Sequence, residues 1–380
     1  MNTADRLQSV QEYYFSKKLR EVRGLMDAGR PIINMGIGSP DLAPSPKVLE
    51  ALRESLTDPM AHQYQSYQGL PELRRAFADF YGEKFGVPLD PATQVLPLMG
   101  SKEGIMHISM AFLNPGDQVL LPNPGYPTYG SVTRLVGAEP IAYGLEREKG
   151  WFPDLVALAR EDLSKVKLMW VGYPHMPTGA TASRAQLGKL VEFARERDIL
   201  LVNDNPYSFV LGREPLSLLA IPGAMDCCLE LNSLSKTFNM AGWRVGMVLG
   251  NAAHIQAVLQ VKSNMDSGMF YGIQKGAIAA LKSGPDWFEA LDGVYTRRRE
   301  LMFQLADALG CRYDRNAVGM FLWAELPKGS KDSEDYIDQL LHEKDIFVAP
   351  GTIFGSKGQG YIRFSLCVKE EKIIEAIKRF

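Results

Sequence analysis

The fold of this chain is most constrained by an alternation, between about residues 45 and 285, of helix-period stretches with short apolar runs. Runs of this length between helices are typical of a mostly parallel β-sheet that helices cover on both faces. Ligands in such folds bind beyond the carboxyl ends of the strands, so we expect the functional side chains just after these runs. The clearest runs are 94–98, 118–121, 166–171, 199–202 and 245–249.

The length of the chain predicts more than one domain. At 380 residues it exceeds the size at which a single core usually keeps growing. After about residue 286 the pattern changes to a long helical stretch and the strand-like runs 319–324 and 361–366. We therefore predict a large domain over 45–285, and a smaller α+β domain over 286–380 that packs with an N-terminal arm over 1–44.

Composition and charge exclude several classes of protein. A formal net charge of -2 gives no basic excess for binding nucleic acid, and no apolar run approaches the length of a membrane span, about 18 residues. Neither the four cysteines nor the five histidines show a metal-ligand spacing, so we expect no metal and reduced thiols. The polar N-terminal residues lack an apolar signal region, and we therefore expect a cytoplasmic enzyme.

The run 233–246 carries the strongest chemical signal, because it places Lys236 among hydroxyl side chains and eight residues before Arg244. A primary amine condenses with an aldehyde cofactor, while the hydroxyls of Ser233 and Ser235 and a guanidinium can hold that cofactor's phosphate. Pyridoxal 5'-phosphate has both groups. Taken alone, such a run is more often an exposed polar turn, so the interpretation depends on the rest of the chain.

Two polar segments follow predicted strands in the first half of the chain. The segment 100–104 opens a helical pattern, and the backbone N–H groups of a helix start bind anions such as phosphate. Tyr126 follows the run 118–121, where an aromatic ring can stack on a planar heterocycle. The ordinary interpretations are a helix cap for the first segment and a loop anchor for the second.

Two further candidates lie later in the chain. Asp204 follows the run 199–202 together with Tyr207, and a carboxylate there can keep a pyridine nitrogen protonated. Arg363 lies between apolar neighbours in a strand-like run, so a half-buried guanidinium needs a planar anionic partner. A turn for Asp204 and an internal salt bridge for Arg363 are the ordinary alternatives.

With these elements in this order, the chain resembles the class I/II aminotransferases of the fold-type I pyridoxal-phosphate enzymes, from about Ile32 to the C-terminus. The resemblance implies an α/β fold, with a mostly parallel seven-stranded sheet between helices in the large domain and a smaller α+β domain. It rests on segments 36–41, 64–74, 100–103, 123–129, 177–179, 204–207 and 233–244 and on Arg363.

The resemblance also implies the roles of individual residues around pyridoxal 5'-phosphate. Lys236 would form the aldimine, Asp204 would pair with the ring nitrogen, and Tyr207 would donate a hydrogen bond to the ring oxygen. Tyr126 would stack on the ring. The phosphate would be held by Ser101, Lys102, Ser233, Ser235 and Arg244.

Substrate binding and assembly follow from the same resemblance. Gly38 and Arg363 would bind the α-carboxylate of the substrate. Tyr64 would reach the phosphate of the neighbouring subunit, which implies a homodimer with shared active sites. The resemblance assigns no partner other than small-molecule amino acids and 2-oxo acids, and we expect neither nucleic acid nor a membrane.

One position departs from the family pattern. Where the family usually has Asn before Pro-Thr-Gly, this chain has Met176 in the run 173–179. A thioether cannot donate a hydrogen bond, so the ionised ring oxygen would lose about 1–3 kcal/mol of stabilisation if the site stays desolvated. Whether His175 or a water takes over this role stays open.

The implied function is amino-group transfer from an L-amino acid to a 2-oxo acid such as 2-oxoglutarate, by a ping-pong mechanism through the Lys236 aldimine. A carbon–sulfur β-lyase of the same fold uses the same groups and stays open, as does an oxoamine synthase that transfers acyl groups. A non-enzymatic cofactor-binding regulator is a further alternative, although the residues before Gly36 leave no room for its DNA-binding domain. A nicotinamide-dependent dehydrogenase is excluded, because Pro40 and Asp41 follow where its fingerprint needs a helix.

The sequence leaves the amino donor open among hydrophobic, aromatic, acidic and diamino acids. No second arginine stands out as the partner of a distal carboxylate. The expected determinants are Ile37, the aromatic run 13–15 and the neighbouring subunit's segment 264–270.

Overall fold

The structure is a computed structural model that describes residues 2–8, 14–330 and 332–380. Tyr13, which we named as a specificity candidate, lies outside these residues. Within the described ranges, no helix is long and apolar enough to cross a membrane.

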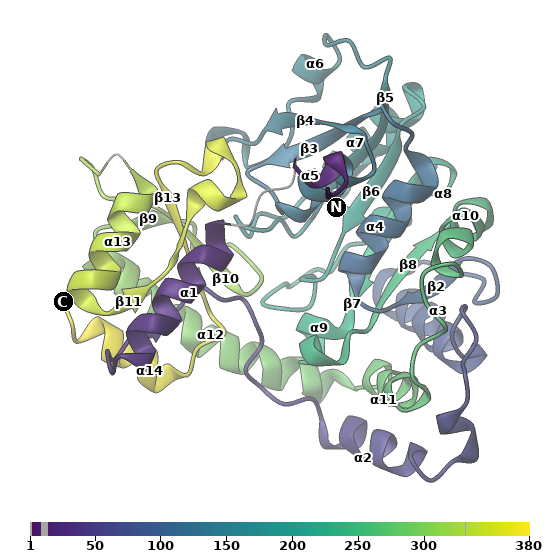
Figure 1. The fold of residues 1–380 in the computed structure, drawn as a ribbon, viewed down its shortest axis with the longest axis horizontal. Coiled ribbons are helices and arrows are strands. Elements are labelled where there is room, and N and C mark those ends of the chain that lie inside the picture. Colours follow the sequence, from purple (N-terminus) through teal and green to yellow (C-terminus); the bar gives the residue numbers. More distant parts are fainter. Residues whose placement is uncertain (1, 9–13, 331) are drawn as a thin grey trace.

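A seven-stranded sheet forms the centre of the molecule, with strand order β2-β8-β7-β6-β5-β3-β4 (Figure 1). Among these strands only β8 runs antiparallel to its neighbours, which confirms the prediction of a mostly parallel sheet. The strands are β2 (Val95–Leu98), β3 (Gln118–Asn123), β4 (Glu139–Gly144), β5 (Val166–Val171), β6 (Leu200–Asp204), β7 (Cys228–Ser233) and β8 (Gly246–Gly250).

Helices cover both faces of this sheet, as its alternating pattern predicts. Successive residues of a strand point to opposite faces, so Leu201 joins one apolar cluster while Leu200 and Val202 join the other. The first cluster includes residues of α3 (Pro71–Phe85), α7 (Arg184–Glu196) and α11 (Tyr271–Leu281), which packs against α2 (Pro46–Ser55). The second includes residues of α4 (Ser101–Phe112), α5 (Thr128–Leu135) and α10 (Ala252–Lys262).

A smaller α+β lobe lies beside the sheet (Figure 1). Its four-stranded antiparallel sheet has the order β12-β13-β10-β9, and a parallel pair joins β1 to β11. The strands are β1 (Ile33–Asn34), β9 (Arg312–Tyr313), β10 (Phe321–Glu325), β11 (Ile346–Phe347), β12 (Ala349–Pro350) and β13 (Tyr361–Ser365). The helices are α1 (Tyr14–Asp27), α12 (Pro285–Ala308), α13 (Ser333–Lys344) and α14 (Glu370–Ile377).

The N-terminal segment joins the two parts of the molecule. Val22 and Ile33 lie in the apolar core of the small lobe, and Phe15 stacks on Phe347 with ring centroids 6.0 Å apart. The short 3-10 helix η1 (Asp5–Leu7) lies against α5 of the large sheet instead (Figure 1). The separate cores support the division near residues 45 and 285, which stays a prediction.

Candidate active site

A cavity of about 320 Å³ opens at the carboxyl ends of the central strands and is closed on one side by the small lobe. Asp204 ends β6 and Ser233 ends β7, which is where the sheet pattern places functional side chains. Of the predicted site residues, the following line the cavity: Gly38, Ser101, Lys102, Tyr126, Asp204, Tyr207, Ser233, Ser235, Lys236, Arg244 and Arg363. Tyr64 does not line it and is 91% exposed.

Asp204 is a buried carboxylate with one oxygen satisfied. The hydroxyl of Tyr129 donates to its Oδ2 at 3.0 Å, and the Tyr129 ring stacks on Trp170 with centroids 4.8 Å apart. Its Oδ1 is buried and accepts no hydrogen bond from any described residue. Burial raises the pKa of Asp204 to about 6. The unpaired oxygen fits a cationic donor, as the protonated ring nitrogen of pyridoxal 5'-phosphate would be.

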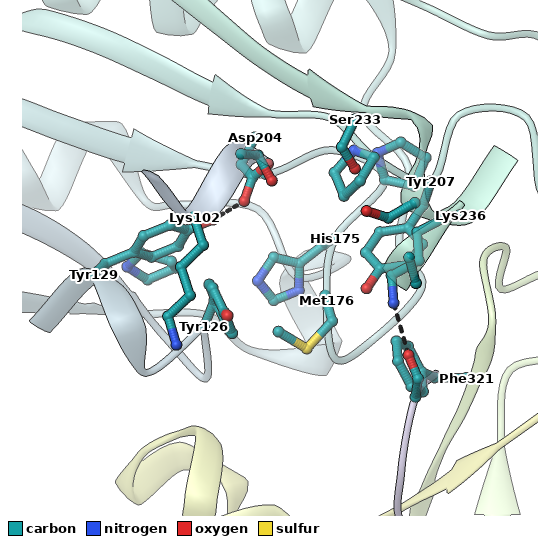
Figure 2. Close-up of a pocket in the computed structure, with 18 of the residues that line it drawn as sticks. Lys102, Tyr126, Tyr129, His175, Met176, Asp204, Tyr207, Ser233, Lys236 and Phe321 are labelled. Carbon is teal, nitrogen blue, oxygen red and sulfur yellow. Dashed lines mark hydrogen bonds between the residues drawn. The ribbon is translucent and has the colours of Figure 1, made fainter. Parts of the chain in front are cut away.

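Lys236 presents its amine at the opposite end of the cavity. It lies in the one-turn helix α9 (Leu234–Thr237), and its Nζ donates to the carbonyl of Gly38 at 2.7 Å (Figure 2). Burial lowers the pKa of Lys236, and the charges of Arg363 and Arg244 lower it further. A Cβ on Gly38 would clash with the ring of Phe321, so only glycine brings this carbonyl so close.

The wall at the start of α4 has the form of a phosphate cradle. Gly100 has φ +89°, and a Cβ there would clash with the Arg244 guanidinium. A Cβ on Gly246 would come within 2.7 Å of the Ser101 backbone nitrogen. The helix start, the guanidinium and the hydroxyl of Ser233 therefore share one small space, which suits a phosphate.

Arg363 lies on β13 and has no carboxylate partner among the described residues. Its guanidinium is stacked between Phe321 at 3.9 Å and Phe354 at 4.6 Å, measured to the ring centroids. Its Nη2 donates to the carbonyl of Gly36 at 2.9 Å. Burial lowers the pKa of Arg363 to about 10, so it stays cationic at neutral pH. The guanidinium is thus held in place and available for an anion.

The segment that departs from the family pattern forms the wall beside Arg363. The Sδ of Met176 lies 3.5 Å from Nη1 of Arg363, the distance of a weak contact. Nδ1 of His175 lies 2.8 Å from the hydroxyl of Thr178, and burial lowers the pKa of His175 to about 3. His175 is therefore neutral at physiological pH, and the guanidinium is the charged group at this wall.

Three aromatic residues around this site, Tyr129, Trp170 and Phe321, were not predicted from the sequence. Tyr129 lies in the segment 123–129 and had no predicted role of its own, yet its hydroxyl donates to Asp204. The ring of Tyr126 lies edge-on to that of Tyr129, with centroids 5.5 Å apart. Trp170 supports Tyr129, and Phe321 packs on Arg363 from the paired strand β10. Trp170 lies near the carboxyl end of β5, whereas Tyr129 lies in α5 and Phe321 begins β10, so no common sequence position identifies them.

One group with metal-ligand chemistry lies outside the cavity, among the residues that the structure describes. The ligand atoms of Glu103, His107 and Asp266 lie within 4.8 Å of one another. The ammonium of Lys262 already contacts Asp266 at 2.5 Å. A cation in this place opposes a bound metal ion, so we assign none.

Comparisons with known proteins agree with this geometry. The sequence profile of the family "Aminotransferase class I and II" matches residues 30–380. The LL-diaminopimelate aminotransferase of Nitratidesulfovibrio vulgaris strain Miyazaki F is 38% identical over 99% of this chain and 97% of its own length. The enzyme of the same name from Dehalococcoides mccartyi strain 195 is 40% identical over 100% of this chain and 98% of its own. The substrate-bound structure of BacF from Bacillus subtilis superimposes with a TM-score of 0.95 and 36% identity, covering 100% and 97% of the two chains.

Proposed function

Because the chain belongs to the class I and II aminotransferases and is a pyridoxal-phosphate-dependent aminotransferase, we propose that Lys236 carries the cofactor and moves the proton during amino-group transfer. One observation carries this assignment. A single cavity brings together the Lys236 amine, the unpaired Asp204 oxygen and the Arg363 guanidinium, which has no carboxylate partner among the described residues. The amine would react with the cofactor's aldehyde carbon, the carboxylate oxygen would accept from its ring nitrogen, and the guanidinium would bind the donor's carboxylate.

When bound, the cofactor supplies an electron sink for the bonds at the donor's Cα. Asp204 would hold the ring nitrogen protonated, since an adjacent negative charge favours the protonated form. Nζ of Lys236 would take the proton from Cα, a role for which its lowered pKa suits it. Tyr207 would donate to the ring oxygen, and Tyr126 would pack on the ring face.

The phosphate and carboxylate contacts would fix the orientation of the reacting bond. Ser101, Lys102, Ser233, Ser235 and Arg244 would hold the phosphate in the cradle at the start of α4. Arg363 would take the α-carboxylate, with Gly38 giving the donor room beside Phe321. Water would be excluded by the aromatic wall behind Arg363, in which Trp323, Phe354 and Tyr361 pack together.

For the donor, we propose LL-diaminopimelate as the first candidate, with 2-oxoglutarate as the acceptor. The relatives that align over nearly the whole chain carry that donor in their names, which also supports a place in amino-acid biosynthesis.

Assembly into a homodimer is part of the same proposal. Tyr64 is 91% exposed, and the turn at Gly268 packs on the backbone of Gln65. Met265 and Phe270, on either side of that turn, are also exposed. An apolar group of this kind is typical of an interface, and a second subunit there would bring Tyr64 into its neighbour's site.

A cytoplasmic location is supported by the thiols. All four cysteines are free, and Cys228, Cys311 and Cys367 are buried while Cys227 is half-buried. Free thiols persist in reducing compartments.

The experiment that tests the proposed function is a half-reaction. Holoenzyme is mixed with LL-diaminopimelate, with leucine or with glutamate in the absence of any 2-oxo acid, and the products are quantified. We expect one equivalent of 2-oxo acid per subunit and no ammonia, because transfer stops when the cofactor holds the amino group. With cystathionine, an amino acid that carries a sulfur leaving group at Cβ, continuous release of ammonia would instead mean elimination, as by a lyase.

A further inference from the structure

The sheet behind the cavity contains a buried carboxylate without a cation. Glu230, in the middle of β7, is 0% exposed. It pairs in register with Asn203, one residue before Asp204, so Glu230 and Asp204 point to opposite faces of the sheet. No lysine, arginine or histidine of the described chain forms an ion pair with Glu230.

Hydrogen-bond donors surround this carboxylate instead. The hydroxyl of Tyr81 donates to Oε1 at 2.9 Å, and Nδ2 of Asn205 lies 3.4 Å from the same oxygen. Nδ2 of Asn203 donates to Oε2 at 3.0 Å, and the backbone N–H of Leu218 does so at 2.8 Å. Glu230 accepts in every one of these bonds, which is the pattern of an ionised carboxylate.

Each donor side chain also makes a second hydrogen bond, which links it to a segment of the active site. Oδ1 of Asn203 accepts the backbone N–H of Tyr173 at 3.0 Å, at the start of the segment that carries Met176. Oδ1 of Asn205 accepts from the hydroxyl of Ser208, next to Tyr207.

The third connection runs through α3 to the phosphate cradle. Nδ2 of Asn232 donates to the Tyr81 oxygen at 3.0 Å. Oδ1 of the same side chain accepts the backbone N–H of Ser233 at 2.7 Å. Ser233 is the N-cap residue of the helical turn α9, which carries Lys236.

We propose that Glu230 is a positioning residue, which fixes the segments of Tyr173, Asp204 to Tyr207 and Ser233 relative to one another by hydrogen bonds from behind the sheet. The proposal rests on the proposed function of the cavity. A buried network that is fully satisfied rigidifies its surroundings, since any displaced donor loses its partner in a medium without water. The charge of Glu230 also adds to the effect of burial in raising the pKa of Asp204.

The first test replaces Glu230→Gln, which keeps the shape but turns one acceptor oxygen into a donor. In the cofactor-free protein we expect faster hydrogen exchange at the amides of Tyr173, Ser233 and Leu218, and in titration a cofactor dissociation constant about ten times higher. Asp292→Asn is the matched control, because Asp292 also accepts a backbone N–H, that of Leu211 at 2.8 Å, outside the network. Wild-type exchange and cofactor affinity in Glu230→Gln would overturn the proposal, even if the variant were less stable.

A second test separates two branches of the network, one through Tyr81 to Ser233 and one through Asn203 to Tyr173. It does not require the Glu230→Gln variant to fold. Tyr81→Phe cuts the branch to Ser233, so we expect weaker cofactor binding with an unchanged KM for the donor. Asn203→Ala cuts the branch to Tyr173, so we expect a raised KM with nearly unchanged cofactor affinity. Equal effects of both variants on both quantities would mean general destabilisation and would contradict the proposal. The exchange and cofactor titrations do not depend on turnover, so they stay informative if the donor assignment fails.

Discussion

Among single residues, two polar groups of the cavity are buried without a charged partner, and their burial lowers the stability of the cofactor-free protein. Asp204 keeps an unpaired buried oxygen, and Arg363 is desolvated between two rings without a carboxylate. Such groups are retained because a ligand completes them, and a protein that lacks the ligand is less stable than its packing allows. This cost is measurable for Asp204.

The prediction for Asp204 concerns the cofactor-free protein. Its folded pKa of about 6 lies above the usual 3.8, so the folded state binds the proton more readily, and stability falls as pH rises from about 4 to about 6. Asp204→Asn removes this cost and keeps an acceptor for Tyr129. Denaturant unfolding should show the variant about 2–3 kcal/mol more stable at pH 8 and nearly equal at pH 4. Asp79→Asn, at an exposed position, serves as the control, and a variant less stable at pH 8 would contradict the account.

The prediction for Met176 concerns the ring oxygen of the bound cofactor. Met176→Asn adds an amide donor beside Arg363, and a donor stabilises an ionised oxygen. The midpoint of the cofactor's absorption titration should therefore fall by about one pH unit. Met176→Leu, which adds no donor, should leave the midpoint in place. An unmoved midpoint in Met176→Asn would mean that another group already supports that oxygen.

Among the elements, apolar runs identified the strands that are buried and apolar over most of their length. They missed β4, a half-exposed edge strand, and β7, which carries Glu230 and Asn232 where a central strand usually has apolar residues. The predicted number of seven strands came from the family resemblance, because the apolar runs alone indicate five. The predicted side chains at the strand ends do meet in one cavity, whereas aromatic supports such as Tyr129 depend on tertiary packing that a local pattern does not encode.

The start of α4 provides a prediction at this scale. Gly100→Ala should push the Arg244 guanidinium out of the cradle, because the added Cβ clashes with it and φ is positive. Cofactor affinity should fall at least tenfold in an equilibrium titration, with far-ultraviolet circular dichroism unchanged. Gly116→Ala is a control, since its φ is also positive but nothing lies near its Cβ. Equal affinities in the two variants would exclude the cradle as the phosphate site.

At the scale of the whole molecule, the cavity depends on contacts between distant segments. Arg298 of α12 binds both carboxylate oxygens of Asp41, at 2.7 and 2.8 Å, and so anchors the N-terminal segment that carries Gly38. The cavity is thus built by the sheet, the small lobe and the N-terminal segment together. In the proposed dimer, a second copy would add the last component.

A mixing experiment tests whether Tyr64 completes its neighbour's site. Lys236→Ala and Tyr64→Ala proteins should each be nearly inactive, but a dimer with one subunit of each has one intact site. After unfolding and refolding of an equal mixture, activity should recover to about a quarter of the wild-type value, because half of the dimers are mixed. Should Tyr64 act within its own subunit, the mixture would stay inactive.

The proposed function requires a covalent bond between Lys236 and the cofactor, and chemical trapping detects that bond. Holoenzyme is treated with sodium borohydride, which reduces a carbon–nitrogen double bond to a stable amine, and is then digested and analysed by mass spectrometry. We predict a pyridoxyl phosphate group on the peptide that contains Lys236, at that residue alone, and none after prior reaction with an effective amino donor. Modification at Lys102 in place of Lys236, or no modification, would contradict the claim.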